Sequence, residues 1–369
     1  MKIRDAVLRN DYVTANAQTV ITDIDLTDPI TAIIIRGSAV NGGTSNLKNW
    51  INDVVTAIEI VDGSDVLISI NLKQAQALHF YTPNAGVPIL RPSEEASGTQ
   101  TEGAMILFGR YLYDKIYALD PTKFTNPQIK VTINLAAVRD VGATGFLSGN
   151  FSLNIIARIM EGLEAAPLGL IMQKEIYSWA PAASGDETID LPRDYPYKSL
   201  LIGTYTKFSD IEITLPKLKL TLDEGKSIPF DIDTKDYWEE NVQRYGKMSY
   251  RHDMLTYNGQ LIDYILHHDP VLSLKSLSAN RFFWVNYEWS GRAQIRVSDS
   301  AGAAVNAAEI VRALVTGSSP HGTMIYTFGD GIDVADYLSV AELKSIKLIA
   351  SQGSASGNAD IVLQQLRPY

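Results

Sequence analysis

The sequence predicts a mainly β protein built from two similar β domains, and two observations lead to this prediction. Short runs of alternating apolar and polar residues recur along the chain, with turn residues between them, which is typical of half-buried antiparallel strands. Segments of the first half also recur in the second half, in the same order. Because few helical patterns lie between the strands, sandwiches or barrels are favoured over a doubly wound α/β sheet.

The strands are predicted from runs that carry aliphatic residues at every second position. Glycine-containing dipeptides, among them Gly42-Gly43, Asp62-Gly63, Glu224-Gly225 and Asp330-Gly331, mark turns between such runs. The predicted strands are 31–36, 65–70, 128–133, 151–156, 217–222, 294–298 and 360–364.

Helices are expected to be short and few. Residues 72–81 follow Asn71 and residues 235–245 follow Thr234, and both Asn and Thr are favoured N-cap residues. Residues 307–315 and 334–345 are further helical candidates. The first 18 residues are expected to form an arm with a weak helix that has Ile3 and Val7 on one side; a packing arm or a loose terminus is the alternative.

An internal duplication relates the two halves of the chain. Residues 62–73 run from a turn through a strand into a helix, and residues 224–235 repeat this order. Residues 24–26 resemble 189–191, and residues 128–132 resemble 294–298, so all three similarities have separations of about 162 to 166 residues. A period this long indicates two copies of a domain, because solenoid units span about 20–50 residues.

The predicted joint lies at 161–169, where Gly162, Pro167 and Gly169 interrupt the strand pattern. We therefore divide the chain into an N-terminal arm or helix (1–18), a first β domain (19–166) and a second β domain (167–369). The second copy is longer, and its surplus is expected in loops around 301–323, which are rich in Ala, Gly and Ser.

Composition excludes several functional classes. The 369 residues contain no Cys, which excludes disulfides, cysteine nucleophiles and thiolate zinc sites. The 42 Asp and Glu outnumber the 32 Lys and Arg, for a net charge of −10, so nucleic-acid binding through the whole surface is not expected. Neither a spanning apolar run nor a signal-peptide core is visible, and a soluble protein made inside the cell is expected.

The histidines do not predict a metal site. His267 and His268 are adjacent in sequence, before Asp269, and neighbouring side chains on a strand point to opposite faces. His79, His252 and His321 are isolated and are expected to be surface or hydrogen-bonded core residues.

Two glycine-containing motifs also fail. Residues 224–227 resemble the end of a phosphate-binding loop, but Leu220 stands where that loop needs glycine. Residues 328–331 lack the third glycine of a dinucleotide fingerprint, so turns explain both.

Carboxylate pairs and aromatic residues leave a sugar-directed alternative open. Glu94-Glu95 lies in what reads as a solvated loop, and Glu239-Glu240 is expected on the exposed face of a helix. Trp284, Tyr287 and Trp289 lie on one alternating strand, where core packing is the default and sugar stacking is the alternative. No catalytic, cofactor-binding or metal-binding residue, and no cofactor, is predicted.

Several segments, in their order along the chain, resemble a known family. These are 60–70 followed by 74–78, 107–114 with 118–128, and 173–177 followed by 184–185 and 189–192. Over residues 19–369 the chain resembles the double jelly-roll major capsid proteins of tailless icosahedral viruses, a tectivirus-like group whose shells often enclose a membrane.

The resemblance implies two tandem eight-stranded jelly rolls with short helices in loops, and a structural, non-catalytic role in a virion assembled from protein made in the host cytoplasm. It implies homotrimers that form pseudo-hexameric capsomers, with neighbouring capsomers, penton proteins and minor capsid proteins as partners. By the same analogy, residues 1–18, with Lys2, Arg4 and Arg9, are a candidate contact to an internal viral membrane or to a neighbouring subunit. Residues 83–103 and 301–323 are the candidate outer loops. No sequence-specific nucleic-acid partner is expected.

Two alternatives remain open at this point. One is a carbohydrate-binding or carbohydrate-active β-sandwich protein. The other is a minor virion or spike protein of similar fold.

Overall fold

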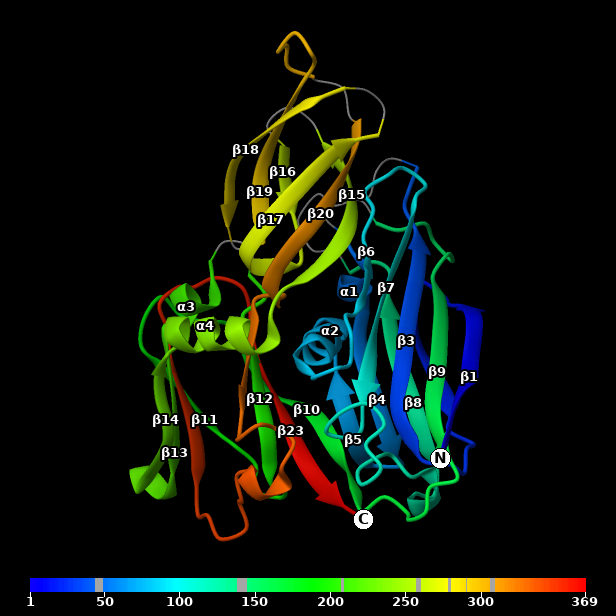
Figure 1. Ribbon diagram of the computed structural model, residues 1–369, viewed down its shortest axis with the longest axis vertical. Coiled ribbons are helices and arrows are strands. Elements are labelled where there is room, and N and C mark those ends of the chain that lie inside the picture. The colour runs from blue at the N-terminus through cyan, green and yellow to red at the C-terminus, as the bar shows by residue number, and fades with distance from the viewer. Residues whose placement is uncertain are drawn as a thin grey trace.

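The computed structural model describes residues 1–43, 49–137, 145–206, 209–256, 260–277, 280–289, 291–305 and 309–369. Two β sandwiches stand side by side, and a smaller β module projects from one end of the pair (Figure 1). We name this module the tower, and the opposite end, where both chain termini lie, the base.

The first sandwich consists of two antiparallel sheets. The outer sheet has the order β1-β9-β3-β7-β6 and the inner sheet has the order β2-β8-β4-β5. Their strands are β1 (Lys2–Val13), β2 (Ala17–Asp23), β3 (Ile30–Val40), β4 (Val55–Asp62), β5 (Asp65–Ile70), β6 (Ile89–Arg91), β7 (Thr99–Leu107), β8 (Pro127–Asn134) and β9 (Ser152–Glu161).

The second sandwich repeats this topology. If the short β6 is set aside and the eight main strands are numbered in chain order, both sandwiches have sheets ordered 1-8-3-6 and 2-7-4-5, which is the jelly-roll arrangement of two four-stranded sheets. The sheets are β10-β23-β12-β21 and β11-β22-β13-β14. Their strands are β10 (Gly169–Trp179), β11 (Asp186–Asp190), β12 (Tyr197–Gly203), β13 (Lys217–Leu222), β14 (Ser227–Asp233), β21 (Thr323–Thr327), β22 (Ile346–Ser351) and β23 (Ala359–Pro368).

One continuous sheet joins the two jelly rolls. Strand β5 pairs in parallel with β10, at Gln173 with Ile68 and Lys174 with Ser69, so the inner sheets merge into eight strands. On strand β12, Leu200 packs in the hydrophobic core of the second jelly roll. The next residue, Leu201, packs in the hydrophobic cluster that includes the core of the first jelly roll. Both faces are therefore buried, which explains why β12 lacks a polar face.

The tower is an insertion in the second jelly roll, between α4 and β21. It contains two three-stranded sheets, β15-β20-β17 and β16-β19-β18. Its strands are β15 (Met248–Thr256), β16 (Gln260–Asp263), β17 (Leu266–Ser276), β18 (Phe282–Trp289), β19 (Arg292–Ser298) and β20 (Glu309–Pro320). Its buried residues, such as Tyr250 and Val315, belong to the same cluster as Trp50 of the first jelly roll.

The helices are short, as predicted: α1 (Ile51–Val54), α2 (Leu72–Tyr81), α3 (Ile211–Thr214) and α4 (Thr234–Tyr245). Asn71 caps α2, since its side chain accepts a hydrogen bond from the Gln74 N–H at 3.0 Å. Helix α2 lies between the jelly rolls and below the tower (Figure 1). Helix α4 starts at Thr234, with Asp233 at the N-cap. No helix in the described ranges is long and apolar enough to cross a bilayer.

The weak helix expected within residues 1–18 is wrong, because Lys2–Val13 is the strand β1 and pairs with β9. As an edge strand, β1 is largely exposed and lacks clear alternation. Pairing with the backbone of β9 and packing of Ala6, Leu8 and Tyr12 on the core outweigh local helical spacing.

Two other predicted helices are also wrong. Strand β20 covers the part of 307–315 from Glu309 onward, and residues 306–308 lie outside the described ranges. Val311, Ala313 and Val315 are buried while Leu314 is exposed, so period-2 alternation was the correct signal. Within 334–345, only Val334–Asp336 forms a single 3₁₀ turn.

The duplication is confirmed at two of its three places. In both jelly rolls the fourth and fifth strands meet in a tight turn, and a helix follows the fifth strand. Residues 24–26 directly follow the second strand of the first jelly roll, and residues 189–191 span the end of the second strand of the second. The third similarity is wrong: residues 128–132 belong to β8, whose equivalent is β22, whereas 294–298 belong to β19 of the tower. The surplus is consequently the whole 248–320 insertion, of which 301–323 covers only the end.

Candidate assembly surfaces

The adjacent histidines His267 and His268, where the tower joins the jelly rolls, contact different partners. His267 Nδ1 lies 2.9 Å from the Ile265 carbonyl oxygen and its Nε2 lies 3.1 Å from that of Thr206. His268 Nε2 lies 3.1 Å from Glu212 Oε2, and its ring lies 4.0 Å from that of Trp238 between centroids. Among the described residues, no group of three or more His, Cys, Asp or Glu could hold a metal ion.

Two more histidines connect the tower to the first jelly roll. His252 Nε2 of β15 lies 3.4 Å from Glu94 Oε1, and His321 Nε2 lies 2.7 Å from Gln76 Oε1 of α2. We name the four buried residues His252, His267, His268 and His321 the histidine seat. Each of these histidines contacts a different segment beneath the tower, so together they hold the tower in position on the two jelly rolls.

The expectation of a solvated loop is wrong for Glu94, which is only 2% exposed. The tower covers this loop: Glu94 N–H donates to the Asp253 carbonyl at 2.8 Å, and Glu94 Oε2 accepts from Leu255 N–H at 3.2 Å. The neighbouring Glu95 is exposed, as are Glu239 and Glu240 on α4. No carboxylate pair of the glycosidase type results from these residues.

The remaining histidine is a core residue of the first jelly roll. His79 Nδ1 accepts from Met105 N–H at 3.2 Å, and its Nε2 lies 3.1 Å from the Ala85 carbonyl oxygen. Burial lowers the pKa of His79. The neutral ring with its proton on Nε2 satisfies both contacts.

Burial and pairing also act on Glu212 in the histidine seat. Burial alone would raise its pKa, but the hydrogen bond and charge of His268, its own backbone N–H and the charge of Lys235 together outweigh burial, so the pKa of Glu212 is lowered. The carboxylate form of Glu212 therefore anchors β17 to α3.

A polar contact crosses the joint between the jelly rolls. Gln74 of α2 donates from Nε2 to Glu175 Oε2 on β10 and, at 2.7 Å, to Asp360 Oδ2 on β23. Burial and the nearby charge of Glu175 raise the pKa of Asp360 to about 8. The same Gln74 completes the capping box of α2, since its Oε1 accepts from Asn71 N–H at 2.8 Å. The Gln74 side chain thus both caps α2 and connects this helix to the second jelly roll.

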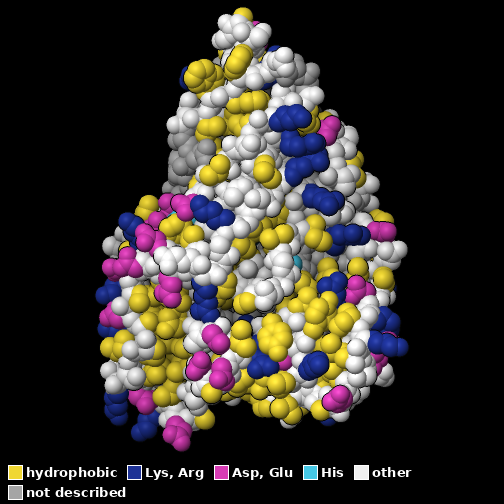
Figure 2. Space-filling model, viewed as in Figure 1, with side chains coloured by type: hydrophobic (Ala, Val, Ile, Leu, Met, Phe, Trp, Pro, Cys, Tyr) yellow, Lys and Arg dark blue, Asp and Glu magenta, His cyan; other side chains and the backbone are white. Residues whose placement is uncertain are grey.

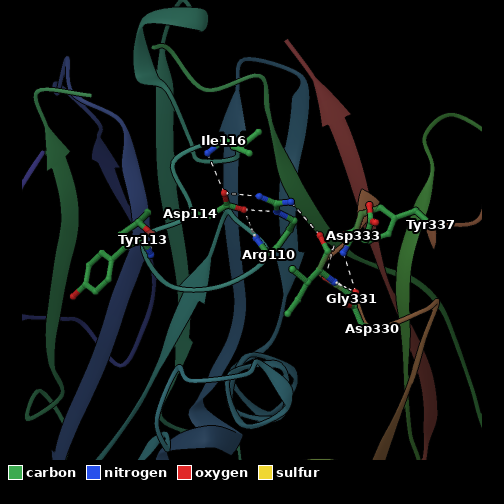
Figure 3. Close-up of polar contacts among 10 residues, drawn as sticks. Arg110, Tyr113, Asp114, Ile116, Asp330, Gly331, Asp333 and Tyr337 are labelled. Carbon is green, nitrogen blue, oxygen red and sulfur yellow. Dashed lines mark hydrogen bonds and ion pairs between the residues drawn. The ribbon is translucent and has the colours of Figure 1, made fainter. Parts of the chain in front are cut away.

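A second contact between the jelly rolls is formed by Arg110 (Figure 3). Arg110 donates from Nε to Asp114 Oδ2 at 2.7 Å and from Nη2 to Asp114 Oδ1 at 3.0 Å. Its Nη1 donates to the Ile332 carbonyl of the second jelly roll at 3.1 Å. Burial would raise the pKa of Asp114, but hydrogen bonds from Arg110 and the Ile116 N–H outweigh it and lower the pKa.

The loop that receives Arg110 is itself held by side chains (Figure 3). Asp330 Oδ1 accepts from the N–H groups of Ile332 and Asp333 at 2.7 and 2.8 Å. Tyr337 donates its hydroxyl proton to the Gly331 carbonyl at 3.1 Å. The residues 328–331 are therefore a turn, as predicted, and Ile332, directly after it, presents its carbonyl to Arg110 of the first jelly roll.

Exposed apolar side chains gather at the base. Met1, Ile116 and Leu168 are each more than two-fifths exposed. Met1 and Ile116 line a 250 Å³ hollow together with Lys115 and residues 162–165. Apolar side chains beside a lysine make this surface a candidate contact site.

The edge strand β1 is a second candidate surface. Ile3, Val7 and Val13 are exposed on it, and Ile21 is exposed on the neighbouring β2. In the described topology β1 pairs only with β9, so its other backbone edge is open. Open edges with apolar side chains favour association with another chain.

The tower carries both basic and apolar residues at its surface. Figure 2 shows Lys and Arg side chains gathered along one side of the tower. Lys275 of β17 is the cross-strand neighbour of Arg312 on β20, and Arg312 Nε lies 2.8 Å from Asp253 Oδ1 on β15. Among the described residues, Arg312 forms an ion pair and Lys275 forms none.

The aromatic strand β18 is divided between two faces. Phe283 and Val285 pack against the core cluster, as predicted for one face, whereas Phe282 and Trp284 are exposed. The side chains of Tyr287 and Trp289 lie outside the described residues.

Comparisons with known proteins find similarity at the level of structure alone. No family model matches the chain, and no curated protein matches it. Among solved structures, the major capsid protein P2 from bacteriophage PM2 is similar, with a TM-score of 0.55, 12% identity, and coverage of 100% of this chain and 98% of P2.

Two further capsid proteins have the same architecture. The major capsid protein of Sulfolobus turreted icosahedral virus has a TM-score of 0.60 at 15% identity, covering 99% of this chain and 96% of its own. The VP54 protein of PBCV-1 has a TM-score of 0.54 at 10% identity, covering 99% and 93%. The chain therefore has the double jelly-roll fold.

Proposed function

We propose that this chain is the major capsid protein of an icosahedral virus, with a structural and non-catalytic role. One observation carries the proposal: both jelly rolls, in order, align over nearly the full length of the major capsid proteins of two different viruses. The contacts of the histidines and buried carboxylates are consistent with it, because they hold elements together. The comparisons give no support to a carbohydrate-active enzyme as the alternative.

The finer proposal is a homotrimer that forms a pseudo-hexameric capsomer. Three copies with two similar jelly rolls each supply six similar units around one axis. Such a ring needs head-to-tail contacts between two different surfaces of each chain. The open edge of β1 and its exposed Ile3 and Val7 are our candidate for one of these surfaces.

Neighbouring capsomers, penton proteins and minor capsid proteins would then be the partners in the virion. For an internal viral membrane, the proposed contact changes because Lys2–Val13 is a strand. We place it at the base, where Met1, Ile116 and Leu168 are exposed beside Lys115. Apolar side chains with flanking cations suit an anionic lipid surface.

Mass measurement and microscopy test the capsomer. Light scattering of the purified protein is expected to give three times the chain mass of 40.6 kDa, and negative-stain images are expected to show a pseudo-sixfold outline. A monomer at the highest attainable concentration would contradict the proposal. In purified particles the protein should dominate a stained gel, because a minor spike protein would be scarce.

Vesicle flotation tests the membrane contact separately. The double variant Ile116→Ser/Leu168→Ser is expected to lose co-flotation with vesicles that contain anionic lipid. Ile213→Ser, which alters an exposed isoleucine on α3, is the matched control. Equal flotation of both variants would contradict a contact through the base.

A further inference from the structure

A shallow trough lies on the outer face of the tower, across β18 and β19. It has a volume of about 330 Å³ and is lined by Trp284, Asn286, Arg296, Val297, Ser298, Gly302 and Ala304. One wall is the segment after β19, which folds back so that Ala304 bridges Ser298 and the Val305 N–H donates to the Val297 carbonyl at 3.0 Å.

An exposed indole lines the trough. Trp284 is 62% exposed, although its neighbours Phe283 and Val285 pack against the core. Its Nε1 is 3.4 Å from Ser298 Oγ, a long hydrogen bond that orients the ring across the two strands. Large aromatic faces left in water commonly mark binding sites.

Polar groups with unused hydrogen-bonding capacity surround this indole. Arg296 lies directly opposite Trp284 in the β18–β19 register and is exposed. Within the described part of the chain, its guanidinium forms no ion pair or hydrogen bond. Asn286 donates one bond to Gln294 at 2.6 Å, and its carbonyl oxygen accepts none from the described residues. Small residues in the wall, Gly302 and Ala304, keep these groups accessible.

We propose that this trough binds an acidic saccharide. A sugar ring offers an apolar C–H face for the indole and hydroxyl groups for Asn286 and Ser298, while a sugar carboxylate would pair with Arg296. A guanidinium binds a carboxylate through two parallel hydrogen bonds. The chain as a whole has a net charge of −10. The unpaired guanidinium of Arg296 beside the exposed ring of Trp284 therefore favours an anionic ligand at this site specifically.

A protein partner fits the trough less well. Stable protein contacts centre on apolar residues with few charges and bury about 1,000 Å² or more. Here one indole, a guanidinium, an amide and a hydroxyl line a hollow of only about 330 Å³. Concave sites with a few placed polar groups are typical of small ligands.

Titration with two matched sugars tests the proposal. Methyl β-D-glucuronide and methyl β-D-glucoside differ only in the carboxylate, so isothermal calorimetry or ligand-observed NMR should show tighter binding of the glucuronide. Trp284→Ala is expected to weaken glucuronide binding by about tenfold or more. Arg296→Gln should weaken glucuronide binding by about ten- to a hundredfold, because this is the change in affinity expected when a hydrogen bond to a charged group is lost. It should also remove the preference for the glucuronide over the glucoside.

Phe282→Ala is the matched control, because Phe282 is an exposed aromatic residue of the same strand outside the trough lining. It is expected to leave binding unchanged, and Trp284→Phe should retain part of it. Equal affinity for both sugars, equal loss in the Phe282 variant, or no binding to the wild-type chain would overturn the proposal. A change in particle mass in Trp284→Ala without any sugar binding would instead reveal a protein contact and overturn it. The sugar-binding outcomes do not depend on whether the chain forms capsomers.

Discussion

Asp360 sets an expected pH dependence of stability at the joint between the jelly rolls. Its pKa of about 8 in the fold exceeds the usual value of about 3.9, so the folded chain binds more protons. This stabilisation is complete below about pH 4 and is lost as the pH rises towards 8. Asp360→Asn should therefore raise the free energy of unfolding at pH 8 by a few kcal/mol, because each unit of pKa shift corresponds to about 1.4 kcal/mol. It should also reduce the loss of stability between pH 6 and pH 8, with little change at pH 4, in urea titrations at pH 4, 6 and 8.

Asp330→Asn is the control for this pH dependence. Hydrogen bonds from the backbone N–H groups of Asp333 and Ile332 lower the pKa of Asp330, so its contribution is present above about pH 4 and is lost as the pH falls. It should leave the stability difference between pH 6 and pH 8 unchanged. An Asp360→Asn protein with the wild-type difference would refute the assignment.

Arg110 illustrates a buried pair whose disruption is expected to be costly. Asp114 is fully buried beneath it, so Arg110→Met would leave a carboxylate without its cation and reduce the free energy of unfolding by about 3 kcal/mol. Arg251→Met is the control, because Arg251 is exposed, pairs with Asp253, and leaves Arg312 on the same carboxylate. Its expected loss is below about 0.5 kcal/mol. Equal losses in urea titrations would contradict the difference in burial.

The residue-scale contacts were the least accessible to sequence reasoning. Gln74 and Asp360 are 286 positions apart, and Arg110 and Ile332 are 222 apart, so no local pattern relates them. Glu94 reads as a loop carboxylate because the segment that covers it, β15, is distant in sequence. By contrast, Asn71 and Gln74 have the spacing of a capping box, which is a local signal.

At the scale of elements, the two equivalent helices allow a matched prediction. Asn71 caps α2 through its side chain, whereas Asp233 at the N-cap of α4 makes no such hydrogen bond. Asn71→Ala should lower the free energy of unfolding by about 1 kcal/mol, and Asp233→Ala by about 0.5 kcal/mol or less. Thermal or urea unfolding of both variants checks this. A larger loss in Asp233→Ala would mean that the helix dipole contributes more than the side-chain cap.

The bounds of a strand could be predicted where one face of the strand is buried and the other is exposed to solvent. Strands β5 and β13 have the predicted bounds because their alternation reports two different environments. Edge strand β1 faces water on most sides, so its residues carry little pattern. The tower was missed for a different reason: residues such as 294–298 alternate like any half-buried strand, and alternation does not reveal to which sheet a strand belongs.

At the scale of the whole molecule, the division of the chain between residues 166 and 167 proposes two duplicated domains. It also raises the question of whether each domain folds independently. The connection between β9 and β10 spans the predicted joint, yet β5 and β10 share backbone hydrogen bonds across it. Leu170, Leu201 and Val362 of the second half belong to the same hydrophobic cluster as Ile58 and Leu67 of the first. The two jelly rolls are thus similar in topology but not independent in packing.

This shared packing predicts that the halves do not fold alone. Residues 1–166 expressed separately would expose the edge of β5, and residues 167–369 would expose the edge of β10 and one apolar face of its sheet. Open edges of this kind cause aggregation. Each half alone is therefore expected to be insoluble, whereas co-expression should yield a soluble complex with the wild-type circular dichroism spectrum. The intact chain should unfold in a single calorimetric transition whose van't Hoff and calorimetric enthalpies agree. Two resolved transitions, or two soluble halves with native spectra, would instead mean that the duplicated domains kept separate cores, and that the eight-stranded sheet contributes little to the stability of the whole.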